Sequence, residues 1–170
     1  MTDESRRSLS PGQAPQRFSA VRTRALSLPL HSPFVTALRR AGAVESLLVE
    51  IDTTGGGRGR GEAPQVWQVT GESVAGAAAC VEQMLAPLVV GRLCTEWREL
   101  CDDVQRAVAR NFGAKAAVET ALCDLVARDA GVPMATVLAS HEPTAAGILA
   151  AVSAGSVGVR SVATDVTISA

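Results

Sequence analysis

Residues 44–63 read VESLLVEIDTTGGGRGRGEA, and this stretch decides the fold that we expect. Apolar and mostly polar residues alternate in its first half, which is typical of a strand with one buried face. A glycine-rich turn over residues 53–57 follows, and residues 58–63 then return as the hairpin partner. Gly59 and Gly61 in the returning strand indicate a bulge or a close backbone approach. The residues expected to face the core are Leu47, Val49 and Ile51.

The flanking segments extend this hairpin into an α+β domain. Residues 18–28 alternate as a further strand, and Pro29 and Pro33 are expected to end it because proline cannot donate to a ladder. Residues 29–43 then form a long connection, and connections of that length are usually functional. Apolar residues recur at helical spacing in three later segments, which are 72–86, 96–110 and 114–130. We therefore expect an α+β fold: a small antiparallel sheet of about three strands, followed by a bundle of three or more helices.

The composition changes along the chain and predicts its organisation. Residues 1–17, rich in Ser, Arg, Gln and Pro, are expected to be a disordered tail, and residues 18–138 the folded domain. Residues 139–161 are rich in Ala, Gly and Ser and are expected to be a connection, with a short helix near 148–152. Residues 162–170 are predicted to form a single strand, which has no partner of its own.

Composition and charge exclude several classes of function. The 170 residues carry 16 Lys and Arg against 17 Asp and Glu, so no basic surface is expected for nucleic acid or for a membrane. Aromatic residues make up 3%, and apolar stretches are too short to span a bilayer. The first residues lack the apolar core of a signal peptide, so we expect a cytoplasmic protein. A (β/α)₈ barrel takes roughly 250 residues, which is more than this sequence holds.

The residues that most often bind metals or act as nucleophiles form no recognisable motif. The glycine-rich turn lacks the dinucleotide spacing, and no Lys-Ser or Lys-Thr follows it. His31 and His141 are far apart, and no CxxC pair predicts a zinc site. The four cysteines are expected to be reduced and mostly buried; they are Cys80, Cys94, Cys101 and Cys123.

Arg39 is the residue of the expected connection with the clearest chemistry. It follows the apolar residues Phe34 and Leu38, and a guanidinium beside an apolar anchor suits capture of a small carboxylate. On these residues alone, a solvated surface arginine remains the alternative.

Four motifs, in this order, resemble the enolase superfamily of the mandelate racemase/muconate lactonizing enzyme type. The resemblance covers roughly residues 18–140 and 162–169, and it is to the dipeptide epimerases of the L-Ala-D/L-Glu type in particular. The motifs are PLHSPFVTALR at 29–39; GEAP at 61–64 with VTGES at 69–73; AKAAVE at 114–119 with ALCD at 121–124; and TDVTIS at 164–169.

The resemblance implies an isomerase made of two parts. An N-terminal α+β capping domain closes over the substrate, and a (β/α)₈ barrel supplies catalytic lysines and the carboxylates that bind Mg²⁺. This chain resembles the capping domain and the first barrel strand, truncated before the barrel. The catalytic lysines and metal carboxylates would lie beyond Ala170, so we expect no catalytic residue and no bound Mg²⁺ here. The chain alone is expected to be inactive, with an apolar face exposed where a barrel would pack.

The resemblance also implies which residues contact substrate. Arg39 would contact the acidic side chain of an Ala-Glu-type dipeptide, and Thr167 would contact substrate from the end of the first barrel strand. Phe34 and Trp67 would line the cap. The expected partners are a small acidic dipeptide or other carboxylate and the missing barrel domain, and the full-length enzyme is expected to be a homo-oligomer.

Two kinds of alternative stay open. A muconate cycloisomerase or a succinylbenzoate synthase belongs to another branch of the same superfamily, although Arg39 favours the epimerase because its charge matches an acidic side chain. A free-standing interaction module, or a pseudogene product without function, would need no barrel at all.

Overall fold

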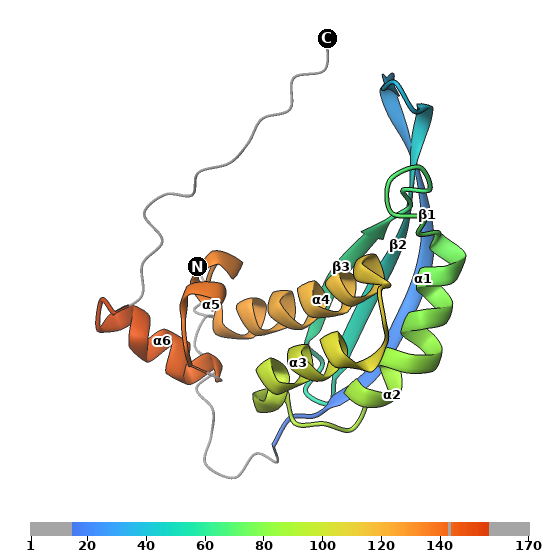
Figure 1. Ribbon diagram of the computed structural model, residues 1–170. Coiled ribbons are helices and arrows are strands. Elements are labelled where there is room, and N and C mark those ends of the chain that lie inside the picture. The colour runs from blue at the N-terminus through green and yellow to red at the C-terminus, as the bar shows by residue number, and fades with distance from the viewer. Residues whose placement is uncertain (1–14, 143, 157–170) are drawn as a thin grey trace.

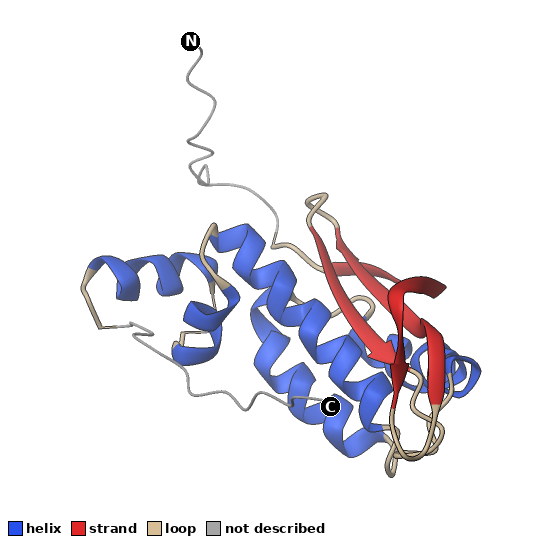
Figure 2. Ribbon diagram, turned by 90° about the horizontal axis from the view of Figure 1, so that it is seen from above, coloured by secondary structure: helices blue, strands red, loops and turns tan. Residues whose placement is uncertain are grey.

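The computed structural model describes residues 15–142 and 144–156. Three strands form one antiparallel sheet in the order β1-β2-β3, and the helices cover one face of it (Figure 1). Seen from above, the sheet and the helical layer lie side by side (Figure 2). The predicted α+β class is therefore confirmed. The strand expected at 162–170 and most of the expected N-terminal tail lie outside the described residues.

The elements run in a simple order along the chain. The three strands come first, and helical segments follow them without a further strand in the described residues. Among the helices, η1 is a π-helical turn and η2 a 3₁₀ turn. The elements are β1 (Phe18–Val35), β2 (Arg40–Thr53), β3 (Arg58–Pro64), α1 (Val74–Cys80), η1 (Val81–Leu85), α2 (Ala86–Val89), η2 (Cys94–Glu96), α3 (Trp97–Ala107), α4 (Phe112–Ala130), α5 (Met134–Ala139) and α6 (Ala145–Ser153).

The long connection expected at 29–43 is wrong, because β1 and β2 continue through it as a two-stranded ribbon. Phe34 pairs with Ala41 and Val35 with Arg40, after a register shift that begins at Pro29. β1 is an edge strand, so prolines that cannot donate a hydrogen bond need not break the ladder. The ribbon therefore extends beyond the helices and ends in a free tip (Figure 1).

Helix α4 is the centre of the core and packs directly on β3. Leu122 and Val118 are fully buried, in a cluster shared with the inward residues of β2. A Cβ atom at Gly59 would overlap the carbonyl oxygen of Ala121, and one at Gly61 would overlap that of Ala117. The close backbone approach predicted for these glycines is confirmed, and it sets the distance between sheet and helix.

The first predicted helix begins and ends later than expected. Ser73 is its N-cap, since the Ser73 hydroxyl accepts a hydrogen bond of 3.0 Å from the Gly76 amide. The helix continues through η1 and α2 to Val89 instead of ending before Pro87. Pro87 has no N–H to donate to the preceding turn, and the π-helical turn η1 directly before it accommodates the missing hydrogen bond.

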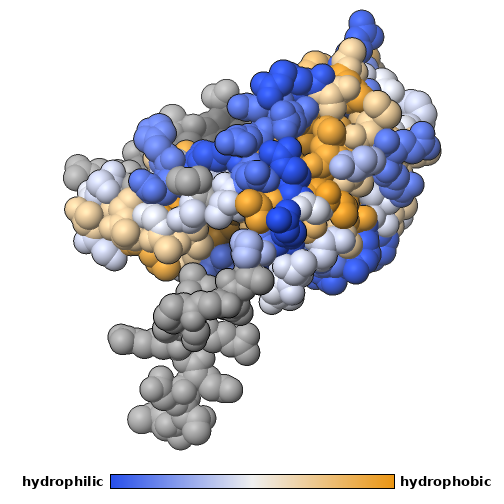
Figure 3. Space-filling model, turned by 90° about the horizontal axis from the view of Figure 1, so that it is seen from below, coloured by the Kyte–Doolittle hydropathy of each residue, from blue (hydrophilic) through white to orange (hydrophobic). Residues whose placement is uncertain are grey.

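The remaining helices complete the layer. α3 ends at Ala107 rather than near residue 110, because Arg110 and Asn111 adopt left-handed backbone conformations that turn the chain into α4. In the expected connection, α6 places Ile148 in the core. No helix in the described part of the chain is long and apolar enough to cross a membrane. In the view from below, apolar patches alternate with hydrophilic surface (Figure 3).

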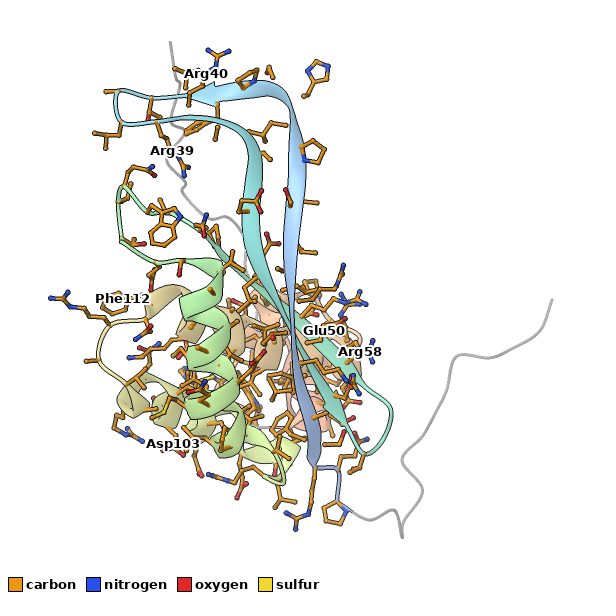
Figure 4. The ribbon with its side chains drawn as sticks, turned by 90° about the vertical axis from the view of Figure 1, so that its right-hand side faces the viewer. Arg39, Arg40, Glu50, Arg58, Asp103 and Phe112 are labelled. Atoms are coloured by element: carbon orange, nitrogen blue, oxygen red, sulfur yellow. The ribbon has the colours of Figure 1, made fainter. Side chains whose placement is uncertain are left out.

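Ion pairs cover the exposed face of the sheet. Asp52 accepts a hydrogen bond of 2.6 Å from Arg58 Nε and also pairs with Arg22. Figure 4 shows Glu50 and Arg58 on this face, and Glu50 pairs with Arg60 at 2.9 Å. The hydrogen bond from Arg58 is the largest cause that holds the pKa of Asp52 below its usual range.

Replacing Asp52 with Asn is expected to weaken folding at neutral pH and to flatten its acid dependence. A carboxyl whose pKa is lowered by folding stabilises the native state above its unfolded pKa of about 3.9, and this stabilisation is lost as pH falls through the folded value. Because Arg58 is well exposed, the effect at pH 7 should stay below about 1 kcal/mol. Urea unfolding of both proteins between pH 3 and 7 measures it.

Asp102→Asn is the matched control, since Asp102 is exposed on α3 and forms no ion pair with the described residues. This control should leave the stability difference at pH 7 near zero. An Asp52→Asn variant with the same pH dependence as the original chain would show that the Arg58 contact does not couple to folding.

Candidate functional site

A pocket of about 380 Å³ lies between the tip of the β1–β2 ribbon and the loop that follows β3. Phe34, Arg39 and Trp67 all line it, so the structure brings together three of the four residues that the sequence singled out. Thr167, the fourth, lies outside the described residues. The full lining is Leu30, Phe34, Arg39, Arg40, Ala41, Ala43, Val44, Glu45, Pro64, Gln65, Val66, Trp67 and Gln68.

The floor of the pocket continues the inner face of the sheet. Alternate residues of a strand share a face, so Ala41, Ala43 and Glu45 lie on the same side of β2 as the buried Leu47. Helices cover that side at Leu47, but the ribbon extends past them (Figure 1). β2 therefore contributes both to the core and to the floor of the pocket, where the small side chains of Ala41 and Ala43 leave room for a ligand.

The turn at the ribbon tip fixes the backbone position of Arg39. The Thr36 amide donates to the Arg39 carbonyl at 2.8 Å, and the Thr36 hydroxyl accepts from the amides of Leu38 and Arg39 at 3.3 and 3.2 Å. The Arg39 guanidinium lies 5.5 Å from the centre of the Phe34 ring, within cation–π range. Arg39 is directed toward the loop after β3, whereas Arg40 points to the other side of the ribbon (Figure 4).

The loop opposite the tip is held by its own backbone. The Val66 carbonyl accepts hydrogen bonds from the amides of Val69 and Thr70 at 3.1 and 3.0 Å. The Gln65 amide donates to the Glu45 carbonyl at 2.8 Å, and this bond ties the loop to β2. Trp67 projects from this loop with 57% of its surface exposed, so its ring is available to a ligand in the pocket.

The pocket can bind a small anion with an apolar portion. The Arg39 guanidinium lies beside the Phe34 ring, and apolar surroundings strengthen an ion pair that forms there. Glu45, which also lines the pocket, accepts a hydrogen bond of 2.5 Å from the Ser27 hydroxyl. Sequence reasoning missed Glu45 and Gln68, because strand register and loop folding bring them here and no local motif marks them.

The described residues do not fit the Mg²⁺ ion that the superfamily resemblance implies. Among residues 15–142 and 144–156, no group of three or more His, Cys, Asp or Glu side chains is placed to hold a metal ion. Carboxylate clusters are what Mg²⁺ needs from a protein. The described residues therefore offer no site for this ion.

Comparison with known families decides the relationship. Residues 19–139 match the model of the mandelate racemase / muconate lactonizing enzyme N-terminal domain. The chain belongs to this family. The predicted membership of the enolase superfamily is confirmed, and the described fold is that of a mandelate racemase / muconate lactonizing enzyme N-terminal domain.

Individual relatives point to two branches of the superfamily. The chain is 34% identical over 124 residues to L-Ala-D/L-Glu epimerase of Bacillus subtilis, covering 73% of this chain and 34% of that protein. It is 40% identical over 121 residues to muconate cycloisomerase 1 of Rhodococcus opacus, covering 70% and 32%.

A solved structure gives the same relationship in three dimensions. The substrate-liganded complex of the Bacillus subtilis epimerase superimposes with a TM-score of 0.68 at 34% identity, over 72% of this chain and 34% of that one. The chain thus spans about a third of the length of the relatives that it matches.

Proposed function

We propose that this domain is the substrate-capping part of a dipeptide epimerase-like isomerase, and that Arg39 selects a dipeptide with an acidic side chain. The observation that carries the proposal is the position of Arg39, held by the tip turn and aimed into a pocket that Trp67 also lines. A carboxylate in this pocket would form a charge-assisted hydrogen bond with the guanidinium. Apolar walls would contact the rest of the side chain.

In this proposal the domain binds and encloses the substrate, and a barrel domain carries the catalytic groups. A barrel would supply the base, and also the Mg²⁺ that stabilises the deprotonated substrate, since no cluster placed to hold a metal ion lies among the described residues. The ribbon tip, which extends beyond the helices, would close over the substrate and exclude water. Leu138 and Leu149, exposed at 62% and 45% near the end of the described chain, offer apolar surface that a barrel would cover.

A muconate cycloisomerase cap is the second candidate. The relative in Rhodococcus opacus, at 40% identity, has the higher identity of the two reported above. Muconate carries carboxylates but no amine, so such a cap would gain nothing from Glu45 in the pocket. An interaction module without a barrel is the third candidate. It predicts no turnover when this domain is fused to the barrel of either relative.

A pair of chimaeras tests the proposal. Residues 18–140 replace the matching N-terminal segment of the Bacillus subtilis epimerase and, separately, of the Rhodococcus opacus cycloisomerase. We expect the first chimaera to exchange the α-hydrogen of the glutamate residue in L-Ala-L-Glu with deuterium from solvent, at least 10-fold faster than that of the second residue in L-Ala-L-Lys. The second chimaera is expected to leave cis,cis-muconate unchanged. Nuclear magnetic resonance follows both reactions.

The epimerase with its own cap is the control for barrel activity. Turnover of cis,cis-muconate by the second chimaera, together with no exchange by a folded first chimaera, would favour the cycloisomerase branch. Equal exchange of the acidic and basic dipeptides would show that this cap does not select by charge.

A further inference from the structure

Two cysteines meet on the side of α4 that faces away from the sheet. Gln105 on α3 donates a hydrogen bond of 2.7 Å to Glu119 on α4, and Cys101 and Cys123 lie one helical turn further along the same interface. No disulfide joins them, and all four cysteines are free. Neither residue belongs to the pocket at the ribbon tip. The pair is therefore a feature that the proposed capping function does not use.

The two thiols are not equivalent. The contact with Cys101, followed by the positive charge of Arg98, lowers the pKa of Cys123 despite its burial. The same contact, with burial, raises the pKa of Cys101. Cys123 is thus the thiol that more readily becomes the nucleophilic thiolate, with Cys101 as its neighbour and proton donor.

Arg98 is held in place to act on this pair. It lies one turn before Cys101 on α3, and its guanidinium donates to the carbonyl of Val137 at 3.0 Å and to that of Ser140. Its Nε atom is buried and has no hydrogen-bond partner among the described residues. A fixed guanidinium beside a thiol stabilises the thiolate form.

The other two cysteines lack this environment. Burial raises the pKa of Cys94 to about 11, and burial likewise raises the pKa of Cys80. No neighbouring thiol contributes to the pKa shift of either residue. They provide internal controls in the same chain.

We propose that Cys101 and Cys123 form a modification site at which a peroxide joins the two thiols in a disulfide between α3 and α4. The Cys123 thiolate attacks one peroxide oxygen, the O–O bond breaks, and the released hydroxide takes up a proton as water. The Cys101 sulfur then attacks the Cys123 sulfenic acid, the S–O bond breaks, and a second water leaves with the Cys101 proton. Two thiols are oxidised and one peroxide is reduced to two waters.

Access and helix packing both permit this reaction. Cys101 is partly exposed and Cys123 is buried, so a molecule as small as hydrogen peroxide would reach the Cys123 sulfur past Cys101. A disulfide needs Cα atoms about 4.4–6.8 Å apart, so forming it would draw α3 and α4 together at this turn. The disulfide would enclose residues 102–122 and restrain α3 against α4.

Peptide mapping of the full chain tests the proposal, because trypsin places each cysteine on its own peptide. The peptides are 61–92 with Cys80, 93–98 with Cys94, 99–106 with Cys101 and 116–128 with Cys123. After treatment with hydrogen peroxide and alkylation of the remaining thiols in denaturant, we expect peptides 99–106 and 116–128 to be joined. Peptides 61–92 and 93–98 should carry the alkyl group, and the intact monomer should have lost two hydrogen atoms.

Serine variants separate the pair from general oxidation. C101S and C123S should each abolish the linked peptide, whereas C80S should leave its yield unchanged. The proposal is overturned if the oxidised chain keeps both thiols, if Cys101 and Cys123 are oxidised separately without joining, or if the disulfide involves Cys80 or Cys94. The mapping of the unaltered chain decides this even if a variant does not fold.

Discussion

Gly61→Ala is expected to destabilise the domain by about 3 kcal/mol or more, a large share of the stability of a domain this size. The added methyl group would overlap the carbonyl oxygen of Ala117, a backbone atom in the middle of α4 that cannot rotate away. Either α4 moves off β3 or the strand shifts, and both open the core around Val118 and Leu122. The urea midpoint, followed by far-ultraviolet circular dichroism, measures the loss.

Gly42→Ala is the matched control in the same sheet. Nothing lies within 4 Å of a Cβ atom at Gly42, so the methyl group enters open space. Its urea midpoint should stay the same or rise slightly, since alanine restricts the unfolded chain. Equal midpoints for the two variants would mean that α4 does not rest on β3 as closely as described.

Arg39→Glu is expected to lower kcat/KM for L-Ala-L-Glu about 100-fold in the chimaera with the epimerase barrel. A hydrogen bond between charged groups contributes about 1.5–3 kcal/mol, and the reversed charge also repels the substrate carboxylate. Turnover of L-Ala-L-Lys should fall much less or increase. Kinetics with both dipeptides measure the change as a switch in preference, which a general loss of folding would not produce.

Arg40→Glu provides the comparison for Arg39. It changes the net charge of the ribbon by the same amount. Arg40 also lines the pocket, but its side chain is directed away from the loop after β3 (Figure 4). We expect a change in kcat/KM of less than about 5-fold, because exposed charges act weakly through solvent. If the two variants behaved alike, the effect would come from overall charge and not from a contact in the pocket.

The parts of the fold that local pattern predicted are those whose buried residues recur at a regular spacing. Alternation in β2 and helical spacing in α4 both follow from burial against each other, so the sequence carried a clear signal for them. The ribbon was mispredicted for a definite reason. Pro29 and Pro33 are read as strand breakers, but whether a strand lies at an edge depends on the tertiary pairing.

The candidate site was predictable only in part. Phe34, Arg39 and Trp67 were singled out with the help of a family resemblance, and only Arg39 had a chemical argument of its own. Glu45 enters the pocket because of strand register, and Gln68 because the loop after β3 folds back on itself. Such residues become neighbours only when the sheet has formed, so no spacing in the sequence marks them.

The central claim is that the pocket at the ribbon tip recognises a carboxylate, and the two tryptophans allow a direct test on the chain itself. Trp67 lines the pocket with 57% of its surface exposed, whereas Trp97 is buried at 2%. Their indole N–H signals can be followed by nuclear magnetic resonance during titration with L-Ala-L-Glu and with its neutral counterpart L-Ala-L-Gln. We predict that only the Trp67 signal shifts, and only with L-Ala-L-Glu. Equal shifts with both dipeptides, a larger shift of Trp97, or no shift at all would contradict the claim.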